Sequence, residues 1–175
     1  MSDRVDKINY YLSIADSITK RGTCIRRNYG AIVVKNDEII STGYTGAPRG
    51  RKNCIDLGYC ARQKLNIKSG EKYELCRSVH AEQNAIISAA RRDLIGGTLY
   101  LVGREANGDF TSYTDSCSMC KRVIINAGIE KVIAKDIDAE CGYREINVQD
   151  WIQYDEVLEE KIKPILEQEK IKEEI

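Results

Sequence analysis

One histidine and two cysteines are the residues of this chain best suited to hold a metal. His80 is the only histidine, Glu82 follows two residues later, and a Cys-x-x-Cys pair stands at Cys117 and Cys120. One imidazole and two thiolates fill three positions around a tetrahedral zinc ion and leave the fourth open to water, whereas structural sites are usually closed by a fourth protein ligand. The pattern therefore predicts a catalytic zinc site, with Glu82 beside it as a carboxylate that moves protons.

Both ligand groups are expected at the starts of helices. Small and apolar residues recur at helical spacing after His80 until Gly96-Gly97, and a second such run follows Cys117 until Gly128. The partial positive charge at a helix N-terminus stabilises thiolate, the form that binds metal. Two alternatives are ordinary buried cysteines near a core histidine, and a redox dithiol. The dithiol would leave His80 and Glu82 without a role.

Four stretches of the chain match a known family. They are residues 29–34, 41–50, 79–85 and 117–121, within about residues 21–135. On these residues the chain resembles the cytidine deaminase superfamily, and the Gly-Tyr-x-Gly-x-Pro stretch from Gly43 to Pro48 is similar to deoxycytidylate (dCMP) deaminases. A His-x-Glu with a later Cys-x-x-Cys is the signature of zinc deaminases of nucleobases, in which the glutamate is not a ligand. Three features depart from the pattern: Ser116 stands where proline is usual, Thr45 replaces asparagine, and about ten extra residues lie around 104–114.

The resemblance implies a zinc-dependent hydrolase that converts dCMP to dUMP with release of ammonia. Glu82 would carry protons to N3 and then to the departing amine of cytosine. Two alternatives stay open: a deaminase of another cytosine nucleoside, nucleotide or nucleic-acid base, and a non-catalytic zinc-stabilised nucleotide-binding protein. The ribose preference, control by dCTP or dTTP, and the oligomer number are not fixed by the sequence.

Length and composition agree with a compact enzyme. The chain has 175 residues, with 27 Lys and Arg against 27 Asp and Glu, so no overall charge favours duplex nucleic acid. No apolar run has the length of a membrane span, and the first residues lack the apolar core of a signal peptide. Seven cysteines, an odd number, fit thiols on metal in a reducing cytoplasm better than a disulfide framework.

Helical and strand patterns alternate along the chain. We expect a helix over residues 5–19, helices after His80 and Cys117, and strands over 31–34, 39–43, 98–102, 131–134 and 143–148, with a turn at Asn36-Asp37. The resemblance implies a three-layer α/β/α sandwich with a mixed five-stranded sheet. Residues 1–150 would form the deaminase domain. Residues 151–175 would form a helical extension, interrupted at Pro164, that packs on the domain or on the partner subunit of a homo-oligomer.

A long segment between Tyr44 and Val79 has little periodicity and needs something to hold it. It contains Cys54, Cys60 and Cys76, and Cys24 lies in the loop before the first strand. Four thiolates could close a structural zinc, so these cysteines are a candidate second metal site; scattered buried cysteines are the alternative.

Substrate contacts are expected from loops near the zinc. Arginine's planar fork suits phosphate, and basic residues cluster at Arg26 and Arg49. Gly46 and Ala47 offer backbone groups, Thr45 takes the place of an asparagine, and Tyr113 is a candidate to stack on the pyrimidine. Each has a plain alternative as a solvated loop residue.

Overall fold

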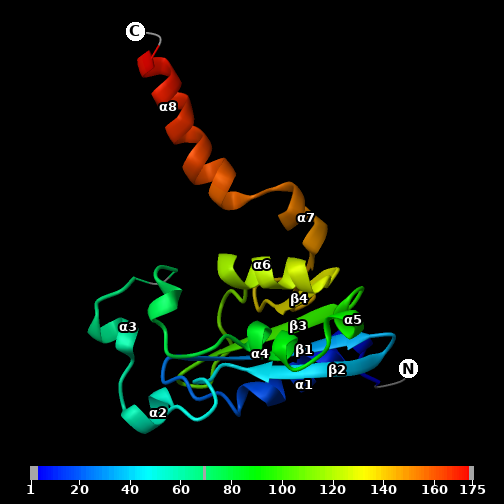
Figure 1. The fold of residues 1–175 in the computed structure, drawn as a ribbon. Coiled ribbons are helices and arrows are strands. Elements are labelled where there is room, and N and C mark those ends of the chain that lie inside the picture. The colour runs from blue at the N-terminus through cyan, green and yellow to red at the C-terminus, as the bar shows by residue number, and fades with distance from the viewer. Residues whose placement is uncertain (1–3, 69, 174–175) are drawn as a thin grey trace.

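Within residues 4–68 and 70–173, which the computed structural model describes, five strands and their connecting helices form three layers (Figure 1). The strands are β1 (Arg27–Lys35), β2 (Glu38–Tyr44), β3 (Thr98–Glu105), β4 (Lys131–Lys135) and β5 (Tyr143–Asn147). The helices are α1 (Lys7–Thr19), α2 (Cys54–Leu57), α3 (Ala61–Lys64), α4 (Ala81–Ile87), α5 (Arg91–Leu94), α6 (Ser118–Ala127), α7 (Val148–Gln153) and α8 (Lys163–Glu173), with a 3-10 turn η1 (Tyr73–Leu75) and a π-helical turn η2 (Leu158–Ile162).

The strands form one mixed sheet in the order β2-β1-β3-β4-β5. β3 and β4 are parallel, and every other neighbouring pair is antiparallel. The β1–β2 hairpin turns at Asn36 and Asp37, whose φ angles of 51° and 68° are those that a two-residue type I′ turn requires. α6 makes the crossover between the two parallel strands, and this places its first turn at one end of the sheet. The predicted sandwich and mixed sheet are confirmed.

Alternating residues of the central strands fill two cores. Ala31 and Val33 of β1 belong to the core beneath α4 and α6, whereas Ile32 and Val34 belong to the core beneath α1. Strand side chains alternate between faces, so an apolar run such as 31–34 can be buried on both sides at once. α1 therefore covers one face of the sheet, and α4, α5 and α6 cover the other.

α4 approaches the sheet at a glycine. A Cβ built on Gly43 of β2 would lie 2.2 Å from the carbonyl oxygen of Ala81 and 2.3 Å from the amide nitrogen of Ala85. No side chain fits in that space. Gly43 therefore sets how closely the start of α4 can lie against the sheet.

Two elements differ from the sequence prediction. The helix after His80 was expected to continue towards Gly96, but α4 ends at Ile87 and α5 begins at Arg91. The hydroxyl of Ser88 donates to the carbonyl of Asn84 at the break, a local bond that competes with helix continuation. The extra residues around 104–114 prolong β3 to Glu105, and Phe110 turns back to form a bridge with Arg104.

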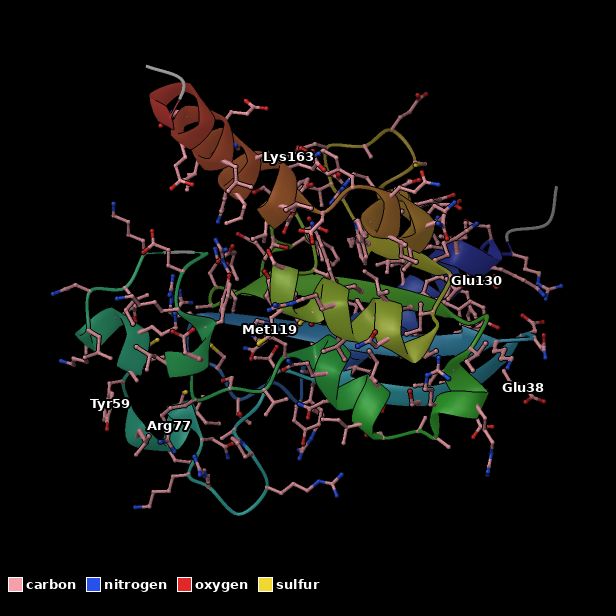
Figure 2. All side chains as sticks on the ribbon, turned by 45° about the horizontal axis from the view of Figure 1, so that its top comes forward. Glu38, Tyr59, Arg77, Met119, Glu130 and Lys163 are labelled. Atoms are coloured by element: carbon pink, nitrogen blue, oxygen red, sulfur yellow. The ribbon has the colours of Figure 1, made fainter. Side chains whose placement is uncertain are left out.

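Residues 45–79, called the central segment below, are held mainly by backbone contacts. The segment's two ends pair with each other, since Gly46 and Val79 exchange hydrogen bonds of 3.2 and 2.8 Å. The amide of Ile55 donates to the carbonyl of Thr23. Inside the segment, a guanidinium nitrogen of Arg62 donates to the carbonyls of Lys68 and Glu71. This segment forms the side of the molecule that carries Tyr59 and Arg77 (Figure 2).

The last helical elements, η2 and α8, extend away from the sheet, whereas α7 lies beside α6 (Figure 1). The Glu156 carboxylate accepts hydrogen bonds from Ser118 and Lys121 of α6, so the extension is tied to that helix at its start. α8 continues directly from η2 and makes no comparable contact with another described element; Lys163 at its start stands clear of the sheet (Figure 2). The predicted interruption at Pro164 does not occur, because residues 156–173 form one continuous helical run in which Pro164 follows the π-helical turn η2. None of the helices in the described ranges is both long and apolar enough to cross a bilayer.

Candidate metal centre and active site

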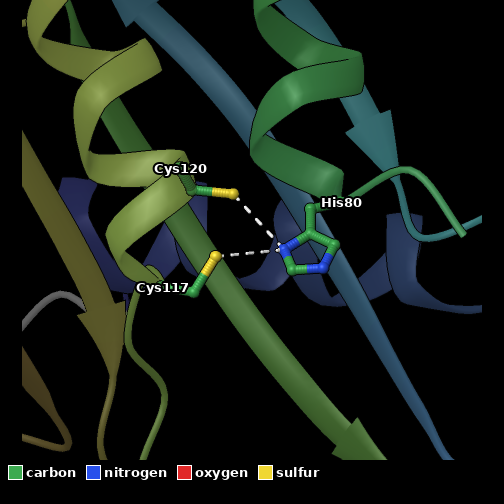
Figure 3. A group of neighbouring side chains, drawn as sticks. All are labelled: His80, Cys117 and Cys120. Atoms are coloured by element: carbon green, nitrogen blue, oxygen red, sulfur yellow. Dashed lines mark hydrogen bonds between the residues drawn. The ribbon is translucent and has the colours of Figure 1, made fainter. Parts of the chain in front are cut away.

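His80, Cys117 and Cys120 come together between two helix starts (Figure 3). The Nδ1 atom of His80 lies 3.5 Å from the sulfur of Cys117 and 3.3 Å from that of Cys120, and all three ligand atoms lie within 4.8 Å of one another. Zinc bonds of about 2.3 Å to sulfur and about 2.0 Å to nitrogen at tetrahedral angles would separate nitrogen from sulfur by about 3.5 Å. The three side chains therefore fit a zinc ion as they stand.

The helix boundaries explain this convergence. His80 is the N-cap of α4 and Cys117 is the N-cap of α6, and both have extended backbone conformations before the helix begins. The backbone amide of His80 donates to the side chain of Gln83, which fixes the entry into α4. Cys120 follows within the first turn of α6, so both sulfurs emerge near its N-terminus. The expected facing helix starts are present.

Electrostatics favours the thiolate form of Cys117, the less buried of the two cysteines. A hydrogen bond from Cys120 lowers the pKa of Cys117 to about 4, and His80 contributes in the same direction against the effect of burial. The pKa of Cys120 is raised because its proton is held by Cys117 and because it is buried. Burial opposes protonation of His80, but its contact with Cys117 and the charge of Glu82 outweigh this and raise its pKa. Metal binding needs both cysteines as thiolates, so a cation bound here would displace any proton they hold.

Glu82 lies in the first turn of α4, almost entirely out of solvent. Its side chain is 4% exposed. Burial raises its pKa above the ordinary value, and the neighbouring His80 partly offsets the rise. A carboxyl group whose pKa is moved towards neutrality can both accept and return a proton near pH 7. A metal held only for structure would not need such a group beside it.

A pocket opens over these residues. His80, Glu82 and Cys117 line its floor, and Arg26, Thr45 and Arg62 are among the residues that line its walls. The ring of Tyr73 meets the His80 ring edge-on, with centroids 5.1 Å apart and planes at 90°. The central segment therefore supplies part of the wall, although its sequence shows no periodic pattern.

The predicted substrate residues fall into two groups. Arg26 and Thr45 line the pocket, and Thr45 is buried with its hydroxyl accepting from the amide of Tyr29. Three others are not lining residues: Gly46 pairs with Val79, and Ala47 and the exposed Arg49 lie further along the loop. Tyr113 is 59% exposed and packs against the guanidinium of Arg144, 4.0 Å from its ring centre.

Several wall residues were not predicted from the sequence, and three of them stand out. Arg62 and Tyr73 belong to the central segment, and Asp115 lies shortly before Cys117. Asp115 sits two residues before a ligand and could have been identified by that proximity. Arg62 and Tyr73 carry no comparable signal, because irregular backbone brings them to the pocket.

Four further cysteines lie on one side of the same pocket. Cys24, Cys60 and Cys76 line it, whereas Cys54 is buried with its sulfur 3.9 Å from the Ser78 hydroxyl. Burial raises the pKa of Cys54, and the other three thiols act on it in the same direction. Among described residues, only the group of His80, Cys117 and Cys120 brings three such ligand atoms within 4.8 Å of one another. A second metal at these four cysteines stays a prediction. All seven cysteines are free.

Comparison with known proteins agrees with this geometry. Residues 5–135 match the family model described as the cytidine and deoxycytidylate deaminase zinc-binding region. The chain is 36% identical over 135 residues to the deoxycytidylate deaminase of Mycobacterium phage D29, covering 74% of this chain and 94% of the relative. It is 32% identical over 127 residues to that of Schizosaccharomyces pombe, covering 71% of this chain and 35% of the longer relative.

The fold also resembles a solved structure, that of dCMP deaminase from the cyanophage S-TIM5 in complex with dCMP and dUMP. The TM-score is 0.53 at 24% sequence identity, with 76% of this chain and 85% of that chain covered. This likeness concerns the fold. Together with the family match and the His/Cys/Cys group, it shows that the chain belongs to the cytidine and deoxycytidylate deaminase family of zinc-dependent hydrolases.

Proposed function

We propose that this protein is a zinc-dependent deaminase that converts dCMP to dUMP and ammonia, with His80, Cys117 and Cys120 as metal ligands. The observation that carries the proposal is the buried Glu82 in the same helical turn as the metal-binding histidine. The names of the phage and yeast relatives support dCMP as the substrate. A zinc-stabilised protein without turnover would have no use for a carboxyl group kept out of water at this position.

The roles of the side chains follow from their positions. Zinc, when bound, supplies a water that is activated near neutral pH. Glu82 would take a proton from the attacking water as its oxygen bonds to C4 and deliver that proton to N3 of cytosine; it would then move the proton of the added hydroxyl to the amine as the C4–N4 bond breaks. Its raised pKa suits a group that must both take and give protons. Burial keeps bulk water from exchanging those protons during the reaction.

The nucleotide preference depends on basic residues near the pocket. Arg26 lines the pocket, whereas Arg49 is exposed and outside the lining. We therefore favour Arg26 of the two as a phosphate contact, with Thr45 on the same wall. Deamination of free nucleosides, of other nucleotides or of single-stranded nucleic acid is the competing function. Stacking aromatic residues and a basic groove would mark the last of these.

The glutamate variant Glu82→Gln tests the proposal. It keeps the size of the side chain and removes its acid–base function, so zinc content and fold should be retained. The rate should fall by about 10²- to 10⁴-fold, the usual share of general acid–base catalysis. Ammonia release would be assayed on dCMP, deoxycytidine, cytidine and dCTP, with zinc measured by elemental analysis.

The exposed Glu130 at the far end of the molecule provides the matched control (Figure 2). Glu130→Gln makes the same chemical change and should leave the rate unchanged. Activity of Glu82→Gln within threefold of the parent would remove the catalytic role. Turnover of another substrate in preference to dCMP would replace the proposed substrate but keep the chemistry.

We also propose that the protein is a homo-oligomer of the cytoplasm. Val157, Leu158, Ile162, Ile165 and Leu166 of the extension are each at least 40% exposed, and α8 lies apart from the sheet. An amphipathic helix without a partner in its own chain is a surface that another subunit can cover. The extension at residues 151–175 would then be a module distinct from the deaminase domain at 1–150.

A further inference from the structure

Arg62 is a buried arginine in the wall of the active-site pocket. Its side chain is 6% exposed, and it projects from α3 of the central segment. One terminal nitrogen, Nη2, donates to the carbonyls of Lys68 and Glu71, each at 2.6 Å. The guanidinium carbon lies 4.5 Å from the centre of the Tyr73 ring. These contacts hold the guanidinium in one orientation.

No described carboxylate lies within ion-pair distance of Arg62. Its Nε atom is also buried without a hydrogen-bond partner. Two other partly shielded arginines do have carboxylate partners: Arg104 pairs with Asp16 at 2.6 Å, and Arg144 pairs with Asp136 at 2.7 Å. A buried cation is costly unless an opposite charge accompanies it. Arg62 is therefore a buried cation without a negatively charged partner among the described residues.

The pocket is where that counter-charge can enter. Arg62 lines the same pocket as His80 and Glu82, and the Tyr73 ring contacts both Arg62 and His80. The guanidinium carbon of Arg62 lies 4.5 Å from the centre of the Tyr73 ring, and the centre of the His80 ring lies 5.1 Å from the same point. Because both side chains line one pocket, a nucleotide whose base lies at the metal site can direct its phosphate towards Arg62.

We propose that Arg62 is a specificity-determining residue that binds the phosphate monoester of the nucleotide substrate. The inference rests on the proposed function, since it takes a cytosine nucleotide as the ligand. Arginine suits the role because its planar guanidinium presents several donors to a phosphate group at once. Arg26 on the same pocket wall would add a second positive charge.

A purely structural role would give Arg62 a different signature. Its two carbonyl contacts also fasten the loop at residues 68–71, so its loss could loosen the pocket as a whole. Arg77 offers a matched control: it lies in the same central segment, donates to the carbonyl of Lys52 at 3.0 Å, and has a buried Nε without a partner. Unlike Arg62, it is not a lining residue of the pocket.

The experiment compares Arg62→Gln, Arg62→Lys, Arg26→Ala and Arg77→Gln in the zinc-loaded full chain. For each, kcat/KM is measured for dCMP and for deoxycytidine, and calorimetry gives the affinity for dUMP, deoxyuridine and inorganic phosphate. Arg62→Gln should lower kcat/KM for dCMP by about 10- to 100-fold, the effect of one charge-assisted contact, and deoxycytidine turnover by less than threefold. The affinity for dUMP should fall likewise, while that for deoxyuridine stays constant. Arg62→Lys should recover part of the loss, and Arg77→Gln should leave the preference unchanged.

Equal losses on nucleotide and nucleoside in Arg62→Gln would overturn the inference and leave Arg62 as a loop anchor. If Arg62→Gln does not fold, two other measurements decide. Equal affinities of the parent for dUMP and deoxyuridine would exclude a phosphate contact. A preference for dUMP that is the same in the parent and in Arg62→Lys would exclude Arg62 as that contact. If the parent enzyme does not turn over dCMP, the proposed function itself is overturned. That result is distinct from those that concern Arg62 alone.

Discussion

Gly43→Ala tests how closely the first zinc helix must lie against the sheet. The added Cβ would be 2.2 Å from the carbonyl oxygen of Ala81 and 2.3 Å from the amide nitrogen of Ala85. Non-bonded heavy atoms pack at about 3.5 Å or more, so α4 would have to retreat by more than about 1 Å. Both clashing groups belong to backbone and cannot rotate away. Because Ala81 follows His80 directly, the retreat would carry the imidazole away from the two sulfurs.

The expected magnitudes follow from that displacement. Overpacking a core usually lowers the free energy of unfolding by about 1–3 kcal/mol, and a clash with two backbone atoms belongs at the upper end. For a domain of this size, about 3 kcal/mol corresponds to a melting temperature lower by roughly 6–12 °C. A shift of about 1 Å at reacting groups commonly reduces the rate by about 10²-fold.

Thermal unfolding, zinc content and ammonia release from dCMP would be measured on Gly43→Ala and on Thr42→Ala. Thr42 is the preceding residue of β2 and is exposed, so its replacement should cost less than about 1 kcal/mol and leave the rate unchanged. A Gly43→Ala enzyme with the melting temperature, zinc content and rate of the parent would refute the argument that this close approach positions His80.

Three further predictions concern the metals and the extension. If the four additional cysteines hold a second zinc, the parent should carry two zinc ions per chain and Cys76→Ser should carry one, with a marked loss of thermal stability; one zinc in the fully active parent would contradict this. Hydrogen bonds from Ser118 and Lys121 lower the pKa of Glu156, so its ionised form stabilises the fold above the unfolded pKa near 4.5. Glu156→Gln should therefore be less stable than the parent at pH 7, and denaturation of the metal-free proteins should show this difference vanishing as the pH falls through the lowered pKa. Leu158→Glu should shift the sedimentation coefficient towards that of the monomer, and an unchanged coefficient would place the subunit contact elsewhere.

The sequence predicted the main helices and strands correctly, because each appears as a local periodicity of apolar residues. The run at residues 31–34 predicted a strand, and the helix starts at His80 and Cys117 were located from the apolar residues that follow them. The break after Ile87 had no glycine or proline to mark it, and a serine side chain supplies the competing bond. Arg62 could not have been assigned to the pocket, since its position depends on backbone carbonyls that come from an irregular loop.

The zinc ligands have a consequence for how this chain acquires its shape. His80 and Cys117 stand 37 residues apart, and β3, a strand paired with a neighbour on each side, lies between them. A metal that joins them acts as a removable cross-link. On the scale used for disulfides, closing a loop of this length raises the free energy of the unfolded chain by about 4 kcal/mol. The same ion then keeps two helices from separating across the middle strand of the sheet. Metal supply during synthesis would thus govern the yield of folded protein as well as its activity.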